Sequence, residues 1–160
     1  MKPETYVRQL RDASKRELLS VTMELARRRY DLELREPVAV SRPQAAYEQV
    51  RDIARGKQKQ LVGLYLDTQN KLIVRRTISV GTLNTTQSHP REILYPAVQH
   101  LAAGFILAHN HPSGNLEPSP EDVEFTRAVA RAGELMGIEL YDHLIVTRDG
   151  FTSLRERGLI

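Results

Sequence analysis

Between residues 61 and 153, short apolar runs alternate with segments whose apolar residues recur every three to four positions. The short runs predict strands and the periodic segments predict helices. The expected strands cover residues 61–66, 72–80, 105–108, 138–147 and 151–153, and the expected helices cover residues 44–55, 90–103 and 120–136. This order predicts an α/β fold in which a layered, mixed β-sheet is flanked by helices.

Turn and cap residues set the expected boundaries. The sequence Asp-Thr-Gln-Asn at 67–70 predicts the loop of a hairpin between the first two strands. Pro90 suits the first position of a helix, and Gly104 is expected to end that helix before the next strand. Residues 119–122, Ser-Pro-Glu-Asp, combine an N-cap serine with proline at the first helical position and an acid at the third. They predict the start of another helix, after a polar loop that covers 109–118.

The front of the chain differs from the rest in charge. Residues 1–60 hold 14 Lys or Arg against 9 Asp or Glu, whereas residues 61–160 hold 9 against 11. Apolar spacing over 5–30 predicts helix, and a capping box at Ser14-x-x-Glu17 makes two helices as good an interpretation as one. We therefore expect a basic helical extension over residues 1–36 and the main domain over residues 37–160.

Composition excludes several kinds of site. The chain has no cysteine, which rules out disulfides, a thiolate nucleophile and a cysteine-ligated zinc, so a metal would depend on His, Asp, Glu and water. No apolar run approaches the roughly 20 residues that span a bilayer, and residues 1–4 lack the layout of a signal peptide. We expect a cytoplasmic protein with no membrane partner.

His109 and His111 stand two residues apart at the end of an expected strand. A period of two places their side chains on the same side of the backbone, so both imidazoles can reach one ion. Asp122 follows in the first turn of a helix, and the turn residues 112–115, Pro-Ser-Gly-Asn, can fold the chain back toward the strand end. Two imidazoles and one carboxylate leave a fourth tetrahedral position for water, as in catalytic zinc sites. The alternatives are two solvated loop histidines and an aspartate that caps its helix.

The string His109-x-His111-x7-Ser119-x2-Asp122 is the motif of the JAMM (MPN-type) metalloproteases residue for residue. Four further segments resemble the RadC branch of that fold. The segments are Ala108-His109-Asn110-His111-Pro112-Ser113-Gly114-Asn115, Gly81-Thr82-Leu83, His89-Pro90-Arg91-Glu92 and Asp142-His143-Leu144-Ile145-Val146. The resemblance covers roughly residues 20 to 160. It implies the layered JAMM/MPN fold, which is similar to that of cytidine deaminases.

The resemblance also implies a function, the hydrolysis of peptide or isopeptide bonds in a peptide or protein substrate. It implies Zn²⁺ on His109, His111 and Asp122, with a bound water as nucleophile. It further implies that Ser119 donates a hydrogen bond to the developing oxyanion. The N-cap interpretation of Ser119 uses the same oxygen atom.

The usual catalytic glutamate of the family is not found at its expected place. In RadC-like chains that glutamate sits just before the first strand of the domain, where this sequence reads Lys-Gln-Lys-Gln over 57–60. We expect Lys59 to stand in its position. Glu92 is the nearest substitute in the sequence, but a glutamate at the third position of a helix that begins at Pro90 is better explained by the helix dipole.

A second departure concerns DNA. The resemblance implies an N-terminal helix-hairpin-helix module whose hairpin needs glycines, and residues 1–55 contain none. Arg27, Arg28 and Arg29 could make weak contacts with nucleic acid, although a solvated helix cap is the favoured interpretation. The alternative function is a DNA-repair-associated RadC-like module, weakly or non-catalytic, that binds nucleic acid or a protein partner.

Asp142 and His143 are adjacent on an expected strand. A carboxylate beside an imidazole can orient it or relay protons near a metal. We favour a packed, hydrogen-bonded structural pair instead.

Overall fold

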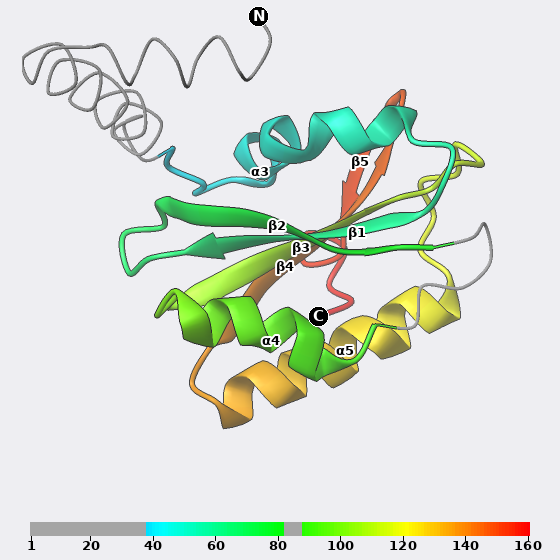
Figure 1. The fold of residues 1–160 in the computed structure, drawn as a ribbon. Coiled ribbons are helices and arrows are strands. Elements are labelled where there is room, and N and C mark those ends of the chain that lie inside the picture. Colours follow the sequence, from blue (N-terminus) through cyan, green and yellow to red (C-terminus); the bar gives the residue numbers. More distant parts are fainter. Residues whose placement is uncertain (1–37, 82–87) are drawn as a thin grey trace, which may run out of the picture. The chain divides into compact units, whose positions relative to one another are not determined.

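The computed structural model describes residues 38–81 and 88–160 (Figure 1). The basic helices expected over residues 1–36, with their three consecutive arginines, lie outside this part of the chain. Among the described residues, no helix has both the length and the apolar character needed to cross a membrane.

The centre of the fold is a five-stranded sheet in the order β2-β1-β3-β4-β5. Its strands are β1 (Gln60–Leu66), β2 (Leu72–Val80), β3 (Gly104–Asn110), β4 (Glu139–Thr147) and β5 (Gly150–Ser153). β3 and β4 run parallel, whereas β1 is antiparallel to β2 and β3, and β4 is antiparallel to β5. The sheet is mixed, which confirms the predicted fold class.

Helices cover both faces of this sheet (Figure 1). They are α3 (Pro43–Val50), the 3-10 helix η1 (Arg51–Arg55), α4 (Pro90–Gln99) and α5 (Pro120–Leu135). α3 and η1 lie on one face, and α4 and α5 lie on the other. Because β3 is central and covered on both sides, all seven of its residues are buried.

The strand period of two divides the apolar residues between two cores. On the α3 side, Val62 and Leu64 of β1 pack with Ile106 and Ala108 of β3. On the α4 and α5 side, the buried cluster contains Leu61, Tyr65, Phe105, Leu107 and Val129. Successive residues of one strand therefore face different helices, and this alternation decides which helix meets each polar residue at the end of β3.

The predicted boundaries of α4 and β3 were wrong. α4 ends at Gln99 rather than near residue 103, and Leu101 adopts a φ of 52°, which the helix cannot accommodate. Gly104 belongs to β3, where a Cβ atom would lie 2.4 Å from the Tyr141 ring. β3 also continues through His109 and Asn110, because both residues keep their pairing with β4, and the predicted loop therefore begins later.

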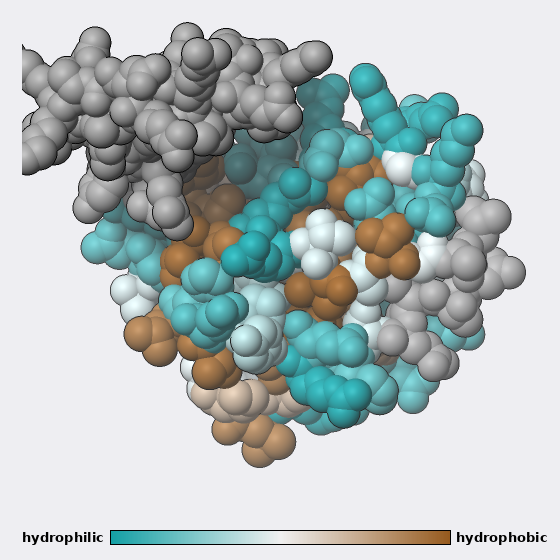
Figure 2. All heavy atoms as spheres, in the orientation of Figure 1, coloured by the Kyte–Doolittle hydropathy of each residue, from teal (hydrophilic) through white to brown (hydrophobic). Residues whose placement is uncertain are grey.

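The face seen in Figure 2 mixes hydrophilic and hydrophobic residues. Hydrophobic atoms gather at its lower left, over the C-terminal ends of α4 and α5. Exposed apolar side chains at these two ends are Val98, Leu101, Leu135 and Met136.

Candidate metal centre

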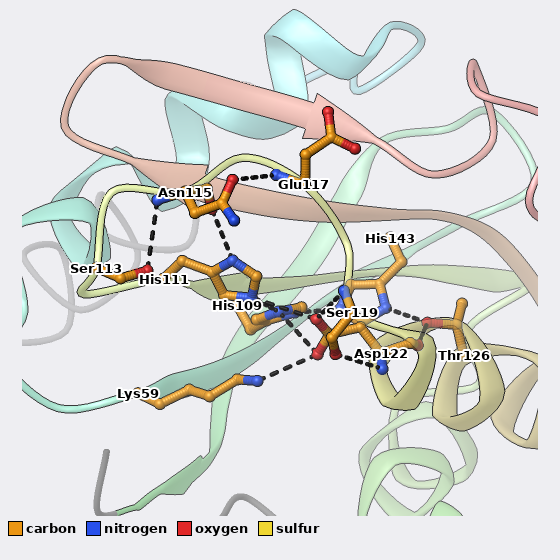
Figure 3. A network of polar contacts seen from close by, with 10 residues as sticks. All are labelled: Lys59, His109, His111, Ser113, Asn115, Glu117, Ser119, Asp122, Thr126 and His143. Atoms are coloured by element: carbon orange, nitrogen blue, oxygen red, sulfur yellow. Dashed lines mark hydrogen bonds and ion pairs between the residues drawn. The ribbon is translucent and has the colours of Figure 1, made fainter. Parts of the chain in front are cut away.

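His109, His111 and Asp122 converge at the end of β3 (Figure 3). The Nε2 atoms of the two histidines lie 2.9 Å apart. His109 Nε2 is 3.3 Å from Asp122 Oδ1, and His111 Nε2 is 3.3 Å from Asp122 Oδ2. Ligand atoms about 2.0–2.1 Å from one tetrahedral zinc are roughly 3.3 Å from each other. The three side chains can therefore hold a metal ion, as their spacing in the sequence predicts.

The local backbone explains this convergence. His109 continues the set of β3 residues that face α5, and His111 follows two positions later with its N–H donating to the carbonyl of Val146 at 3.0 Å. Gly114 then turns the chain with a φ of 80°, a conformation that glycine adopts without a steric penalty. The loop returns to the start of α5, where Asp122 occupies the first turn and faces the two imidazoles.

A chain of hydrogen bonds fixes the proton on His109. The Thr126 hydroxyl has one proton, which it donates to the Asp122 carbonyl at 2.5 Å, so its oxygen must accept from His143 Nδ1 at 2.6 Å. Neutral His143 then has a lone pair on Nε2, which accepts from His109 Nδ1 at 2.8 Å. His109 therefore carries its proton on Nδ1, and the lone pair of its Nε2 points toward His111 and Asp122.

The proton of His111 is fixed by a single partner. Its Nδ1 lies 2.7 Å from the backbone carbonyl of Asn115, and a carbonyl can only accept. In its neutral form, His111 therefore also has its lone pair on Nε2. Two lone pairs at 2.9 Å, beside a carboxylate, repel one another unless a cation lies among them. The chemistry of this donor set fits a divalent metal ion such as zinc.

Burial keeps the two inner imidazoles neutral. Burial lowers the pKa of His109 to about 4, although the Asp122 carboxylate partly opposes that shift. Burial also lowers the pKa of His143 well below its ordinary value, with a further contribution from His109. Burial alone would raise the pKa of Asp122, but polar contacts that include the hydrogen bond from the Ser119 N–H outweigh it and hold the carboxyl ionised. Neutral imidazoles and an ionised carboxylate are the states that bind metal.

Ser119 and Asp122 form a reciprocal cap at the start of α5. The Asp122 N–H donates to Ser119 Oγ at 3.1 Å, and the Ser119 N–H donates to Asp122 Oδ2 at 3.0 Å. This capping box agrees with the cap pattern in the sequence, and it also orients the carboxylate toward the histidines. The cap uses a lone pair of the Ser119 oxygen, so the hydroxyl proton is still available to a ligand oxygen.

Lys59 lies beside the three candidate ligands. Its Nζ atom is 3.1 Å from Asp122 Oδ1, and its side chain is 23% exposed. The segment before β1, which the sequence resemblance aligned with the catalytic glutamate of the family, therefore does reach the site. At this point the site has an ammonium group, as the sequence predicts, where the resemblance implies the carboxylate usual in the family.

Asn110 holds the Lys59 segment in place from the opposite face of β3. Its buried side chain accepts from the Gln60 N–H at 2.7 Å and donates to the carbonyls of Gly56 and Gln58 at 3.2 and 3.0 Å. The Gly81 N–H adds a hydrogen bond to the Lys59 carbonyl at 2.9 Å. These contacts fix the backbone on either side of Lys59, and its side chain reaches Asp122 from there.

Glu92 has a different role. Its carboxylate accepts a hydrogen bond from the His89 N–H at 3.1 Å, which caps α4 and favours the helix-capping interpretation. Glu117, in the loop before α5, pairs with Arg157 at 2.8 Å, and in Figure 3 its carboxylate points away from the histidines. In the described part of the chain, no second carboxylate contacts the candidate ligands.

Asp142 and His143 are packed and hydrogen-bonded as expected, but through the backbone N–H of His143 and not through its imidazole. The Asp142 carboxylate accepts from the backbone N–H of His143 at 2.7 Å and from the Ser153 hydroxyl at 2.6 Å, whereas the His143 imidazole faces His109 and Thr126. Sequence reasoning considered a role for His143 near a metal but did not favour it, and it missed the roles of Thr126 and Asn110. The alternation of side chains along β4 could have indicated the face of the sheet on which His143 lies, but not the residues that it contacts.

The fold and the site together define a layered α/β domain with a candidate His-His-Asp metal centre. The family model described as the RadC-like JAB domain matches residues 40–159 of this chain. The chain belongs to the RadC-like JAB domain family.

Curated relatives extend this match. The chain is 45% identical over 142 residues to a UPF0758 protein of Shouchella clausii, covering 88% of this chain and 61% of that protein. It is 38% identical over 168 residues to a UPF0758 protein of Bacillus licheniformis, covering 96% of this chain and 75% of that protein. It is 41% identical over 123 residues to a UPF0758 protein of Aquifex aeolicus, covering 77% of this chain and 53% of that protein. The chain thus spans only part of the length of these relatives.

Proposed function

We propose that this chain is a zinc-dependent hydrolase of peptide or isopeptide bonds. The observation that carries the proposal is the convergence of two imidazole Nε2 atoms, 2.9 Å apart, with the Asp122 carboxylate, whose oxygen atoms lie 3.3 Å from them. Membership of the JAB family supports the same class of site. Zinc held by these residues would supply a more acidic water and an electrophile that polarises the scissile carbonyl.

The residues around the ligands suit this reaction in part. His143 and Asn115 hold the two histidines in the tautomers that present Nε2. The Ser119 hydroxyl is half-buried and can donate its proton to a substrate oxygen while its lone pair caps α5. Lys59 is not suited to proton abstraction, because an ammonium group has no lone pair to accept a proton. We therefore expect slow hydrolysis.

The metal and the reaction are tested separately. Elemental analysis of the chain at equilibrium with saturating zinc should give one bound zinc per molecule, and replacing both His109 and His111 with alanine should abolish this binding, because one carboxylate alone is a weak zinc site. Stoichiometric zinc in the double variant would refute the ligand assignment.

The reaction is tested on a mixture of unstructured peptides and isopeptide-linked conjugates, with cleavage followed by mass spectrometry. Zinc-loaded wild type should cleave at least one member slowly. Ser119→Ala should reduce the rate by roughly 10²–10³-fold with zinc retained, as expected for the loss of an oxyanion donor. Equal cleavage by the His109, His111 double-alanine variant would show that the activity does not belong to this site.

The contact between Lys59 and Asp122 favours a second candidate, a weakly or non-catalytic RadC-like module that uses the site to bind a protein partner or nucleic acid. Lys59 stands next to the metal ligands, where the resemblance implies a general base. Such a base typically raises the reaction rate on the order of 10²–10⁴-fold. The two candidates differ in the assay above, because the module would bind zinc stoichiometrically and cleave no conjugate.

A further inference from the structure

Lys59 and a metal ion would compete for the same oxygen atom. Asp122 Oδ1 lies 3.1 Å from Lys59 Nζ and 3.3 Å from His109 Nε2. A metal that binds His109 and Asp122 must therefore approach close to the ammonium. Since both are cations, the charge of Lys59 opposes metal binding, and the opposition is strong because the Asp122 side chain is only 9% exposed.

The backbone that carries the ammonium is held in place. The backbone on either side of Lys59 is tied to the buried Asn110 side chain, and its own carbonyl accepts from Gly81. The side chain is mostly covered, so its rotation into solvent would expose the carboxylate that it neutralises. In the absence of metal, Lys59 supplies the positive charge that the ionised Asp122 would otherwise lack.

We propose that Lys59 is a tethered cation that occupies the metal-binding carboxylate in the metal-free protein and weakens metal binding. This inference rests on the proposed metal site but not on peptide hydrolysis. It makes the centre a site of modest affinity that gains and loses its ion readily. Metal binding then depends on displacing an internal ion pair, so occupancy follows the supply of free metal.

The test measures the dissociation constant of Zn²⁺ for the chelator-stripped full chain by competition with a chromogenic chelator. Lys59→Gln should bind zinc about tenfold more tightly than wild type or better, because it removes the competing charge. Lys59→Arg keeps the cation and should stay within about threefold of wild type. Lys57→Gln, which removes an exposed charge two residues away, controls for net charge and should have little effect.

Thermal unfolding provides a second measurement, in which Lys59→Gln should lower the unfolding temperature without metal but increase its rise with zinc. Without metal, Lys59→Gln should unfold at a lower temperature than wild type, because Asp122 loses its partner. Saturating zinc should then raise its unfolding temperature more than it raises that of wild type. If Lys59 only supported the local structure, the variant would bind zinc more weakly, and that result overturns the proposal.

The outcomes also separate this inference from the proposed function. If wild type binds zinc and Lys59→Gln binds it equally or less tightly, the competition is refuted while the metal site stands. If neither wild type nor any variant binds zinc, both proposals fail together.

Discussion

The His143 imidazole lies between a candidate metal ligand and a threonine hydroxyl. Its Nδ1–H donates to Thr126 and its Nε2 accepts from His109. The Thr126 hydroxyl has only one proton, and this fixes which group donates and which accepts in each hydrogen bond of the series. Hydrogen bonds of this kind orient the ligands of metal sites and select their tautomers. His143 therefore acts through His109 and would not contact a metal itself.

We predict that His143→Phe lowers the affinity for Zn²⁺ by about 10–100-fold, the usual effect of losing a partner of a metal ligand. The phenyl ring keeps most of the packing but leaves the buried His109 Nδ1–H without an acceptor. Thr126→Val should give a smaller loss of Zn²⁺ affinity, since Thr126 is one hydrogen bond further from the candidate ligand His109. Affinity is measured by chelator competition, with circular dichroism to check folding. A Phe variant within twofold of wild type would contradict the assigned proton positions.

Lys59 also leads to a prediction about catalysis. At saturating zinc, Lys59→Glu should raise peptide hydrolysis at least tenfold, because a carboxylate beside the site can accept a proton. Glu92→Gln should leave the rate unchanged, since the Glu92 carboxylate caps α4. Initial rates on one peptide substrate compare the two variants. A collapse of the rate in Glu92→Gln, with no gain in Lys59→Glu, would place the base elsewhere.

Among the secondary structure elements, β3 supports both sides of the site. His109 faces α5 and its neighbour Asn110 faces the segment between η1 and β1, as the period of two requires. One strand end therefore holds a candidate ligand and positions Lys59 at the same time. The reciprocal cap of α5 adds Asp122 from the other direction.

The contacts of Asn110 predict a loss of stability when they are removed. Asn110→Ala should lower the free energy of unfolding by about 1–3 kcal/mol, because backbone groups of Gly56, Gln58 and Gln60 lose their hydrogen bonds to a buried side chain. Asn115→Ala, at an exposed loop position, should cost much less. Urea denaturation measures both. Equal losses in the two variants would show that the Asn110 contacts do not stabilise this segment.

For the chain as a whole, the distribution of charge bears on nucleic acid binding. The chain has a net charge of +3, and its basic excess belongs to the first 60 residues. At the candidate site the charge of Lys59 is paired with that of Asp122. Attraction to phosphate would therefore come from the front of the chain.

We predict weak DNA binding that falls steeply with salt, because a small charge surplus without a base-reading element gives only phosphate attraction. Fluorescence anisotropy with a duplex at about 50 and 200 mM salt measures this dependence. Replacing Arg27, Arg28 and Arg29 with glutamine should remove most of the binding. Tight, sequence-selective binding at physiological salt would refute the prediction.

Local sequence patterns were sufficient to predict the fold class, the strand and helix order, and the grouping of His109, His111 and Asp122. Apolar periodicity, cap residues and the short spacing of the two histidines are properties of neighbouring residues, so they can be read along the chain. The cap at Ser119 and the hairpin of β1 and β2 were predictable for the same reason.

The surroundings of the candidate ligands were not predictable in this way. Lys59 meets Asp122 across 63 residues, and His143 meets His109 across 34. Such contacts depend on strand register and on how α5 packs against the sheet, and many distant pairs of polar residues are compatible with the same local pattern. Family resemblance could align Lys59 with a glutamate, but the ion pair with Asp122 arises because β1 and β3 are adjacent and α5 covers their ends.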